Sequence, residues 1–319
     1  MNIEARVAIG IDLGGTNVVA GLVQEDGQVL ASERERTRPE RGESAVIETL
    51  ASLVQRVAGD RKPAAVGIGC PGFIDPLRGV VLLASNLAWT NVPLAAKLEA
   101  RAGLPVVLDN DVRMFTFAEA KAGAGQGYPV VLGLTLGTGM SAALVHQGAI
   151  YRGGGFLAGE VGHIPIPGIP YRCSCGLTGC LETIASATGI ARLARETVQA
   201  GTPTVLASMH ERAELLTAAD VSQAYAEGDP AAASILGQVG RTLGEALSYL
   251  TPMLSPDAIV IGGGAAQAGE PLFAPLRRTL RERLLPMYGD RVAVVQAKHL
   301  DHAGVIGSAM YALSQRSKE

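Results

Sequence analysis

Aromatic residues and cysteines are scarce in this 319-residue chain, and neither sign of charge dominates it. Aromatic residues make up 4% of the sequence, which has one tryptophan and four cysteines. The formal net charge is −3, and the most highly charged stretch, Glu33 to Arg41, alternates in sign. No basic face for nucleic acid is therefore indicated. Hydrophobic residues at 48% supply enough material for a buried core and exclude a disordered chain.

Two features that would direct a chain to or across a membrane are also missing. The N-terminal segment does not have the charged-then-apolar layout of a signal peptide, which predicts a cytoplasmic protein. The uncharged run 122–145 holds several glycines and a Gly-Thr-Gly turn, so we expect two buried strands there and no spanning helix. The length favours two domains or one bilobal unit.

Strands that alternate with helices along the chain predict an α/β fold. The strands expected from apolar runs and alternation are 6–13, 17–23, 28–32, 64–69, 105–108, 258–261 and 292–296. The helices expected from helical spacing of apolar residues are 44–57, 94–101, about 112–122, 185–200, 217–227, 231–250 and 304 to about 314. The second half should therefore be mostly helical.

Two segments that begin at Ile9 and Leu132 share one layout, although they lie 123 residues apart. IGIDLGGTNVVAGLV and LGLTLGTGMSAALV both consist of an apolar strand, a Gly/Thr turn and a second apolar strand. Few positions are identical, but the shared layout predicts two similar lobes that each present a glycine turn.

Both of these turns suit a phosphate group. Glycines let backbone N–H groups come close to phosphate oxygens, and a carboxylate at Asp12 can hold Mg²⁺ beside them. For either loop alone, an ordinary tight hairpin is an equally good interpretation, because neither matches a Walker loop or a dinucleotide fingerprint. The residues of these two turns that are expected to bind phosphate or its Mg²⁺ are Asp12, Gly14, Gly15, Thr16, Gly137, Thr138 and Gly139.

Three of the four cysteines lie within eight residues and follow a histidine. His163, Cys173, Cys175 and Cys180 form the pattern H-x9-C-x-C-x4-C. In a chain without an export signal, such crowding favours metal over disulfides. Four ligands of this kind suit a closed tetrahedral zinc site, which would organise structure and leave no position for an activated water.

These motifs resemble the ROK family of sugar kinases and sugar-responsive repressors. DLGGT is similar to the first phosphate loop of the family, LGTG to its second, and 259–269 to its adenosine-site segment. The resemblance therefore implies that Gly262 and Gly263 also bind the nucleotide. The resemblance implies a duplicated actin-like (ribonuclease H-like) ATPase fold with two lobes and a central cleft. It implies a small lobe at 1–111, with a C-terminal helix at about 304–319, and a large zinc-bearing lobe at 112–303. Met140 and Ser141 replace glycines that usually follow LGTG.

The resemblance also assigns a catalytic base and a sugar site. LDNDVRMF matches the catalytic segment of the family, which implies that Asp111 accepts the proton of the attacking sugar hydroxyl. By position alone, Asp111 is equally well placed as the N-cap of the helix that follows. The resemblance implies that His163 serves zinc with one ring nitrogen and sugar with the other. The residues that it assigns to sugar binding are Asn86, Asn110, Asp111, Glu160, His163 and Glu182.

The expected activity is ATP-dependent phosphorylation of a hexose, with Mg²⁺ and a structural Zn²⁺ as cofactors and a homodimer or homotetramer as the assembly. The motifs look most like those of bacterial glucokinases, so glucose and a place in glycolysis are expected. Kinases for mannose, fructose, allose and N-acetylhexosamine share much of the scaffold, and polyphosphate or ADP are alternative donors. A ROK repressor would need a DNA-binding domain ahead of Asp12, where only 11 residues stand. Another actin-like ATPase would not explain the zinc motif.

Overall fold

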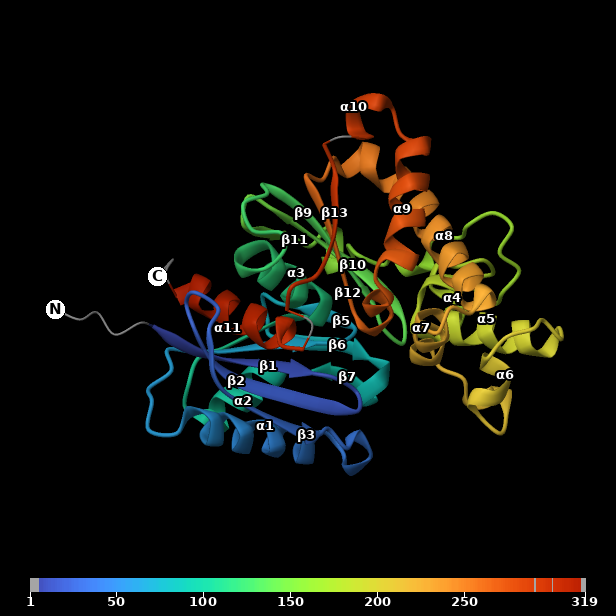
Figure 1. Ribbon diagram of the computed structural model, residues 1–319. Coiled ribbons are helices and arrows are strands. Elements are labelled where there is room, and N and C mark those ends of the chain that lie inside the picture. The colour runs from blue at the N-terminus through green and yellow to red at the C-terminus, as the bar shows by residue number, and fades with distance from the viewer. Residues whose placement is uncertain (1–5, 290, 300, 317–319) are drawn as a thin grey trace. The chain divides into compact units, whose positions relative to one another are not determined.

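The computed structural model describes residues 6–289, 291–299 and 301–316 (Figure 1). They pack into two compact units: the first holds the described residues up to 127, then 143–158, then those from 298, and the second holds 128–142 and 159–297. Residues 112–127 thus lie in the first unit. The lobe boundaries expected from the sequence stay a prediction, and their residues 1–5, 290, 300 and 317–319 lie outside the described part.

A five-stranded mixed sheet in the order β3-β2-β1-β4-β8 forms the centre of the first unit. Its strands are β1 (Val7–Leu13), β2 (Asn17–Gln24), β3 (Val29–Arg36), β4 (Val66–Cys70) and β8 (Val106–Asn110). β1 pairs antiparallel with β2 and parallel with β4, and β4 pairs parallel with β8. The mixed-sign segment Glu33 to Arg36 falls on the exposed edge strand β3, which confirms that it is solvated.

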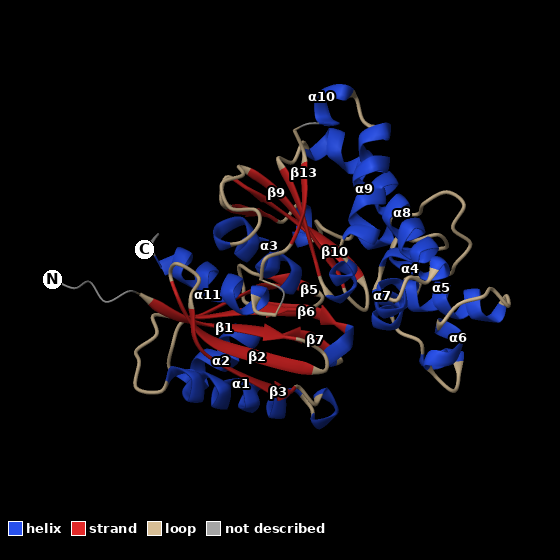
Figure 2. Ribbon diagram, viewed as in Figure 1, coloured by secondary structure: helices blue, strands red, loops and turns tan. Residues whose placement is uncertain are grey.

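Helices cover both faces of this sheet (Figure 2). α1 (Glu43–Ala58) and α2 (Leu94–Ala102) lie on one face, and α3 (Asp111–Ala122) and α11 (Ala303–Arg316) on the other. α11 comes so close to β1 that a Cβ at Gly10 would stand 1.8 Å from the carbonyl oxygen of Val305. Only glycine fits there, so this glycine of the repeated segment serves helix packing.

A small antiparallel sheet, absent from the sequence-based expectations, lies between β4 and α2 in the chain. It consists of β5 (Phe73–Asp75), β6 (Val80–Ala84) and β7 (Trp89–Val92) in that order. The turn from β6 to β7 carries Asn86. The three strands have three to five residues each, which is too short for an alternating pattern to stand out.

The second sheet repeats the plan of the first. Its order is β11-β10-β9-β12-β13, so each strand has a counterpart in β3-β2-β1-β4-β8. The strands are β9 (Val130–Leu136), β10 (Met140–His146), β11 (Ala149–Tyr151), β12 (Ala258–Gly262) and β13 (Ala293–Gln296). β12 pairs parallel with both β9 and β13. This match of strand order confirms the internal repeat expected from the two glycine-turn segments.

The helices of the second unit are α4 (Glu182–Ala185), α5 (Ala187–Gln199), α6 (Leu206–Met209), α7 (Ala218–Ala226), α8 (Pro230–Leu254), α9 (Glu270–Arg283) and α10 (Pro286–Gly289). The helix expected at 185–200 is broken at Ser186, whose hydroxyl caps α5 by accepting a hydrogen bond from Gly189 N at 3.1 Å. α9 was not expected, because Pro271 and Pro275 hide its apolar stripe. No helix in the described ranges combines the length and apolarity that crossing a membrane requires.

Candidate functional site

The first glycine turn lies between β1 and β2 and is held by main-chain hydrogen bonds. Gly14 N donates to Asn17 O at 2.9 Å, and the Thr37 hydroxyl donates to Gly14 O at 2.6 Å. A Cβ at Gly15 would stand 2.9 Å from the Cβ of Asn86. The fold thus brings the predicted phosphate loop and the predicted sugar residue Asn86 together, although 70 residues separate them.

Asp12 stands at the end of β1 beside a second carboxylate and a helix N-terminus. Burial, together with the neighbouring Asp111 carboxylate, raises the pKa of Asp12 to about 7, against the opposing effect of Arg34. At Gly304, near the start of α11, a Cβ would stand 2.6 Å from the Cγ and Oδ2 of Asp12. Two acidic groups in such a position suit a cation, which would relieve their mutual repulsion.

Asn110 and Asp111, at the junction of β8 and α3, have separate roles. Asn110 is the N-cap: its Oδ1 accepts hydrogen bonds from Val112 N at 3.0 Å and Arg113 N at 3.3 Å. Its Nδ2 donates to Gly72 O at 3.2 Å. Asp111 is the first residue of the helix, so the interpretation of Asp111 as the N-cap was wrong. The carboxylate of Asp111 therefore sits in the first turn of α3, in the positive field of the helix start.

In the second unit, the glycine turn after β9 is tied to the start of α5. Gly137 N donates to Gly139 O at 3.0 Å, Ala187 N donates to Gly137 O at 2.8 Å, and the Thr188 hydroxyl donates to Thr138 O at 2.6 Å. This turn is therefore anchored from outside its own hairpin, as a loop that must hold its shape around a phosphate requires.

The turn after β12 meets the same end of β9. Gly263 has φ +87°, and a Cβ there would stand 2.6 Å from the carbonyl oxygen of Leu136. The predicted nucleotide residues Gly262 and Gly263 thus lie beside the loop at 137–139. Met140, which replaces a glycine of the family pattern, is buried at the start of β10.

The four predicted zinc ligands converge in the second unit. The donor atoms of His163, Cys173, Cys175 and Cys180 all lie within 4.8 Å of one another. Cys175 Sγ is 3.6 Å from Cys180 Sγ, and Cys173 Sγ is 3.6 Å from His163 Nδ1. Ligands bound to one tetrahedral zinc at about 2.3 Å stand about 3.7 Å apart, so these residues fit a single ion.

The predicted sugar residues of the second unit surround His163. Its Nε2 is 3.8 Å from Glu160 Oε2, and its Nδ1 is the nitrogen that faces Cys173. Glu182 Oε1 accepts a hydrogen bond from the Cys173 thiol at 3.0 Å, and a Cβ at Gly139 would stand 3.2 Å from Glu182 Oε2. One ring nitrogen therefore points to the metal ligands and the other to a carboxylate, which is the arrangement that a double role requires.

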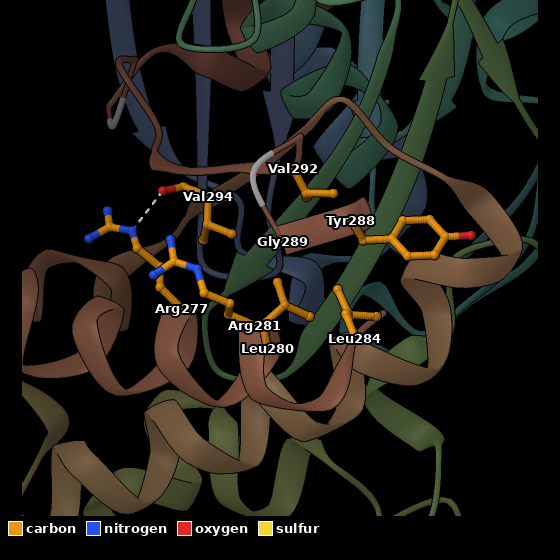
Figure 3. Close-up of a pocket in the computed structure, with 8 residues that line it drawn as sticks. All are labelled: Arg277, Leu280, Arg281, Leu284, Tyr288, Gly289, Val292 and Val294. Atoms are coloured by element: carbon orange, nitrogen blue, oxygen red, sulfur yellow. Dashed lines mark hydrogen bonds between the residues drawn. The ribbon is translucent and has the colours of Figure 1, made fainter. Parts of the chain in front are cut away.

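A separate cavity of about 60 Å³ lies among α9, α10 and β13, as Figure 3 shows. It contains none of the predicted site residues. Arg277 on its rim already donates to Val294 O at 3.0 Å and to the Glu270 carboxylate at 2.8 Å. The space is small, and its floor is formed by leucine and valine side chains, so we assign no function to it.

Sequence reasoning missed one group of polar residues behind the Asn110–Asp111 segment. Asp109 is fully buried and is paired with Arg113 and Arg152, which lies in the chain after β11. In the sequence, the charged residues Asp109 and Arg113 on either side of Asn110 and Asp111 could have indicated an ion pair there. The partner at residue 152 could not be foreseen, because only the tertiary structure brings it there.

The sequence profile described as "ROK family" matches residues 8–315. A glucokinase of Halalkalibacterium halodurans is 36% identical over 98% of this chain and 96% of its own length. A ROK family glucokinase from Streptomyces griseus, solved in complex with glucose and AMPPNP, has a TM-score of 0.84 and 32% identity over 97% of this chain and 99% of that one.

Similarity also extends to a regulator. The xylose repressor of Caldicellulosiruptor bescii is 28% identical over 98% of this chain but only 80% of the repressor. About a fifth of that protein thus has no counterpart in the alignment. The likeness of the whole chain to the Streptomyces griseus glucokinase bears out the expected actin-like ATPase fold.

Proposed function

Because the chain belongs to the ROK family, we propose that it is an ATP-dependent hexose kinase that converts glucose to glucose 6-phosphate. The observation that carries the proposal is the similarity, over nearly the full length of both chains, to the Halalkalibacterium halodurans glucokinase. The glycine turns and the carboxylates at the end of β1 and the start of α3 supply groups that such a reaction needs.

In this proposal, Asp111 accepts the proton of the attacking primary hydroxyl. The sugar is oriented by hydrogen bonds with the amides of Asn86 and Asn110, the carboxylates of Glu160 and Glu182, which accept from its hydroxyls, and the imidazole of His163. The backbone N–H groups of the two glycine turns, with Thr16 and Thr138, hold the phosphates, and Gly262 and Gly263 line the adenosine site. Asp12 would hold Mg²⁺, which neutralises charge on the phosphates. Most of the rate enhancement would come from positioning and charge stabilisation.

Zinc has a structural role in this proposal. His163, Cys173, Cys175 and Cys180 use up the four positions of a tetrahedral ion, so none is left for water or substrate. The backbone N–H of Leu177 lowers the pKa of Cys175, which favours the thiolate that a metal needs. The ion would fix the ring of His163.

The cellular setting is part of the proposal. We propose a cytoplasmic enzyme at the entry to glycolysis, without a nucleic-acid partner because the sequence indicates no basic face. The resemblance to the ROK family suggests a homodimer or homotetramer. Cell fractionation and light scattering of the purified protein are the direct measurements.

A coupled assay of ADP release tests the kinase proposal. Glucose should stimulate ADP release strongly, and a panel of mannose, fructose, allose and N-acetylhexosamines should rank below it. ATP, polyphosphate and ADP are compared as donors by measuring the hexose phosphate that each produces. ATP turnover that no hexose changes would refute the proposal.

The assignment of the base is tested separately. Asp111→Asn keeps the shape of the side chain but cannot accept the proton, so turnover should fall at least about 10³-fold. Glucose binding, measured by calorimetry, should change by less than about threefold. A variant that binds glucose more weakly but keeps the wild-type kcat at saturating glucose would contradict the assignment.

The likeness to a xylose repressor supports a second candidate, a sugar-responsive regulator. It predicts sequence-specific DNA binding that xylose or glucose releases. A chain that phosphorylates glucose and shows no binding to promoter DNA above the nonspecific level would eliminate this candidate.

A further inference from the structure

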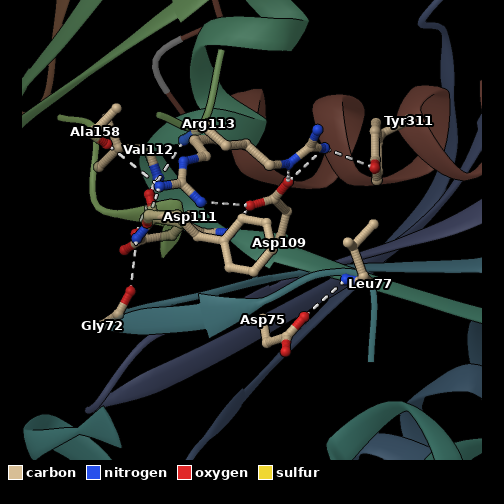
Figure 4. A network of polar contacts seen from close by, with 12 residues as sticks. Gly72, Asp75, Leu77, Asp109, Asp111, Val112, Arg113, Ala158 and Tyr311 are labelled. Carbon is tan, nitrogen blue, oxygen red and sulfur yellow. Dashed lines mark hydrogen bonds and ion pairs between the residues drawn. The ribbon is translucent and has the colours of Figure 1, made fainter. Parts of the chain in front are cut away.

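A buried carboxylate in the first unit is shared by two guanidinium groups. Asp109 Oδ1 accepts from Arg113 Nη1 at 3.0 Å, and Oδ2 accepts from Arg152 Nε at 2.7 Å. The Asp109 side chain is 0% exposed and that of Arg113 is 5% exposed. Arg152 also donates to the Tyr311 hydroxyl of α11 at 2.8 Å (Figure 4). Buried ion pairs of this kind contribute little net stability, so a role beyond stability has to be sought.

The second terminal nitrogen of the Arg113 guanidinium, Nη2, binds the loop that contains Phe156 and Ala158, whose backbone is strained. This nitrogen donates to Phe156 O at 2.6 Å and to Ala158 O at 3.3 Å. Phe156 has φ +63°, a left-handed conformation that a bulky side chain rarely adopts, and Gly155 beside it has φ +63°. A backbone in this conformation persists only where its surroundings hold it. Arg113 supplies that hold from α3.

The contacts that join Asp109, through Arg113, to the carbonyl oxygens of Phe156 and Ala158 form a bridge between two segments of the chain. Both ends of this bridge lie next to proposed site residues. Asn110 N donates to Asp109 Oδ1 at 2.8 Å, and Asp111 follows in the chain. At the other end, Ala158 precedes Glu160 by two residues. The planar guanidinium of an arginine can bind a carboxylate with one nitrogen and carbonyl oxygens with another. A lysine cannot reproduce this, because its ammonium group has a single nitrogen.

We infer that Arg113 is a positioning residue for hexose phosphorylation: it ties the segment that carries the base Asp111 to the loop that leads to Glu160. The inference rests on the proposed kinase function. Loss of the guanidinium would let the two segments drift apart, and a displacement of about 1 Å costs on the order of 10²-fold in rate. The glycine turns that would hold the nucleotide have no contact with this bridge among the described contacts.

The experiment compares Arg113→Lys with wild type in full steady-state kinetics for glucose and for ATP. We expect kcat/KM for glucose to fall about 10–100-fold, whereas KM for ATP changes less than about threefold. The matched control is Arg283→Lys, which alters an arginine that pairs with Glu245 at 2.9 Å on α8. This control should leave both substrates unaffected.

A purely structural role predicts a different result. It would lower the amount of folded protein and its melting temperature but leave both KM values and the turnover per nucleotide-binding site unchanged. That pattern would overturn the inference, as would an increase in KM for ATP as large as the increase in KM for glucose. Wild-type protein without hexose kinase activity would instead refute the proposed function.

A second variant keeps the test decisive if Arg113→Lys does not fold. Asp109→Asn retains the size of the side chain but removes the charge that orients Arg113. Like Arg113→Lys, it should lower kcat/KM for glucose with little change in KM for ATP, but by a smaller factor. Unchanged kinetics in a folded Asp109→Asn protein would count against the bridge.

Discussion

Replacing Asp12 by asparagine should stabilise the protein while it disables the proposed phosphate site. The carboxylate stands at the end of β1, where burial and the nearby Asp111 raise its pKa from 3.8 to about 7. The folded protein therefore binds this proton more tightly than the unfolded chain. Asp12 destabilises the fold progressively as the pH rises from about 4 to 7, and the full cost is present above pH 7.

The size of the effect follows from the shift. About three pKa units at ~1.4 kcal/mol each give an upper value of roughly 4 kcal/mol. Asp12 is partly exposed to solvent, so we expect a smaller cost. Between pH 5 and pH 8, the free energy of unfolding of wild type should fall relative to that of Asp12→Asn by about 2 kcal/mol.

Urea denaturation at several pH values, without added Mg²⁺ or nucleotide, measures this difference. The matched control is Asp60→Asn, which changes an exposed carboxylate of the same unit and should show no such trend. In the presence of Mg²⁺ and ATP, Asp12→Asn should lose most of its activity, since its amide is a poor cation ligand. A stability difference that does not vary with pH, or an Asp12→Asn variant that is less stable than wild type at pH 8, would refute the reasoning.

Three further predictions concern other parts of the chain. Gly304→Ala, whose Cβ would stand 2.6 Å from the Asp12 carboxylate, should lower kcat/KM for ATP at least about tenfold with little change in melting temperature, as kinetics and calorimetry would show. Glu119→Gln should lower the free energy of unfolding, measured by urea denaturation, by about 2–4 kcal/mol, because the buried carboxylate accepts hydrogen bonds from the backbone N–H groups of residues 124, 298 and 299. A decrease below ~0.5 kcal/mol would contradict this account. Cys180→Ser should reduce bound zinc well below about one ion per chain in metal analysis and lower the melting temperature; full zinc content would exclude Cys180 as a ligand.

Local pattern was sufficient for much of the fold. Apolar spacing in 44–57 predicted α1, observed as Glu43–Ala58, because the face that a helix buries repeats every few residues. α9 was missed, although Leu272, Phe273, Leu276 and Leu280 form its buried stripe. Pro271 lies in the first turn, where proline is tolerated. Pro275 lies inside the helix, where proline is normally excluded, and this masked the helical pattern in the sequence.

The proposed site divides in the same way. The zinc ligands could be recognised from the sequence, since three of them are within eight residues and their donor types select a metal. The roles of Asn110 and Asp111 could not be separated, because either residue can start a helix. The structure decides for Asn110 as the cap by directing its Oδ1 to two backbone N–H groups.

The sequence by itself thus determined the repeated strand–turn–strand plan, the glycine turns and the Cys/His cluster, all of which depend on residues close together in the chain. Only the tertiary structure decided what lies around them. Gly304 makes room for Asp12 from 292 positions away, and Arg152 reaches Asp109 across 43 positions. Such contacts arise where strands and helices from distant segments pack against each other, and no local pattern records which segments these will be.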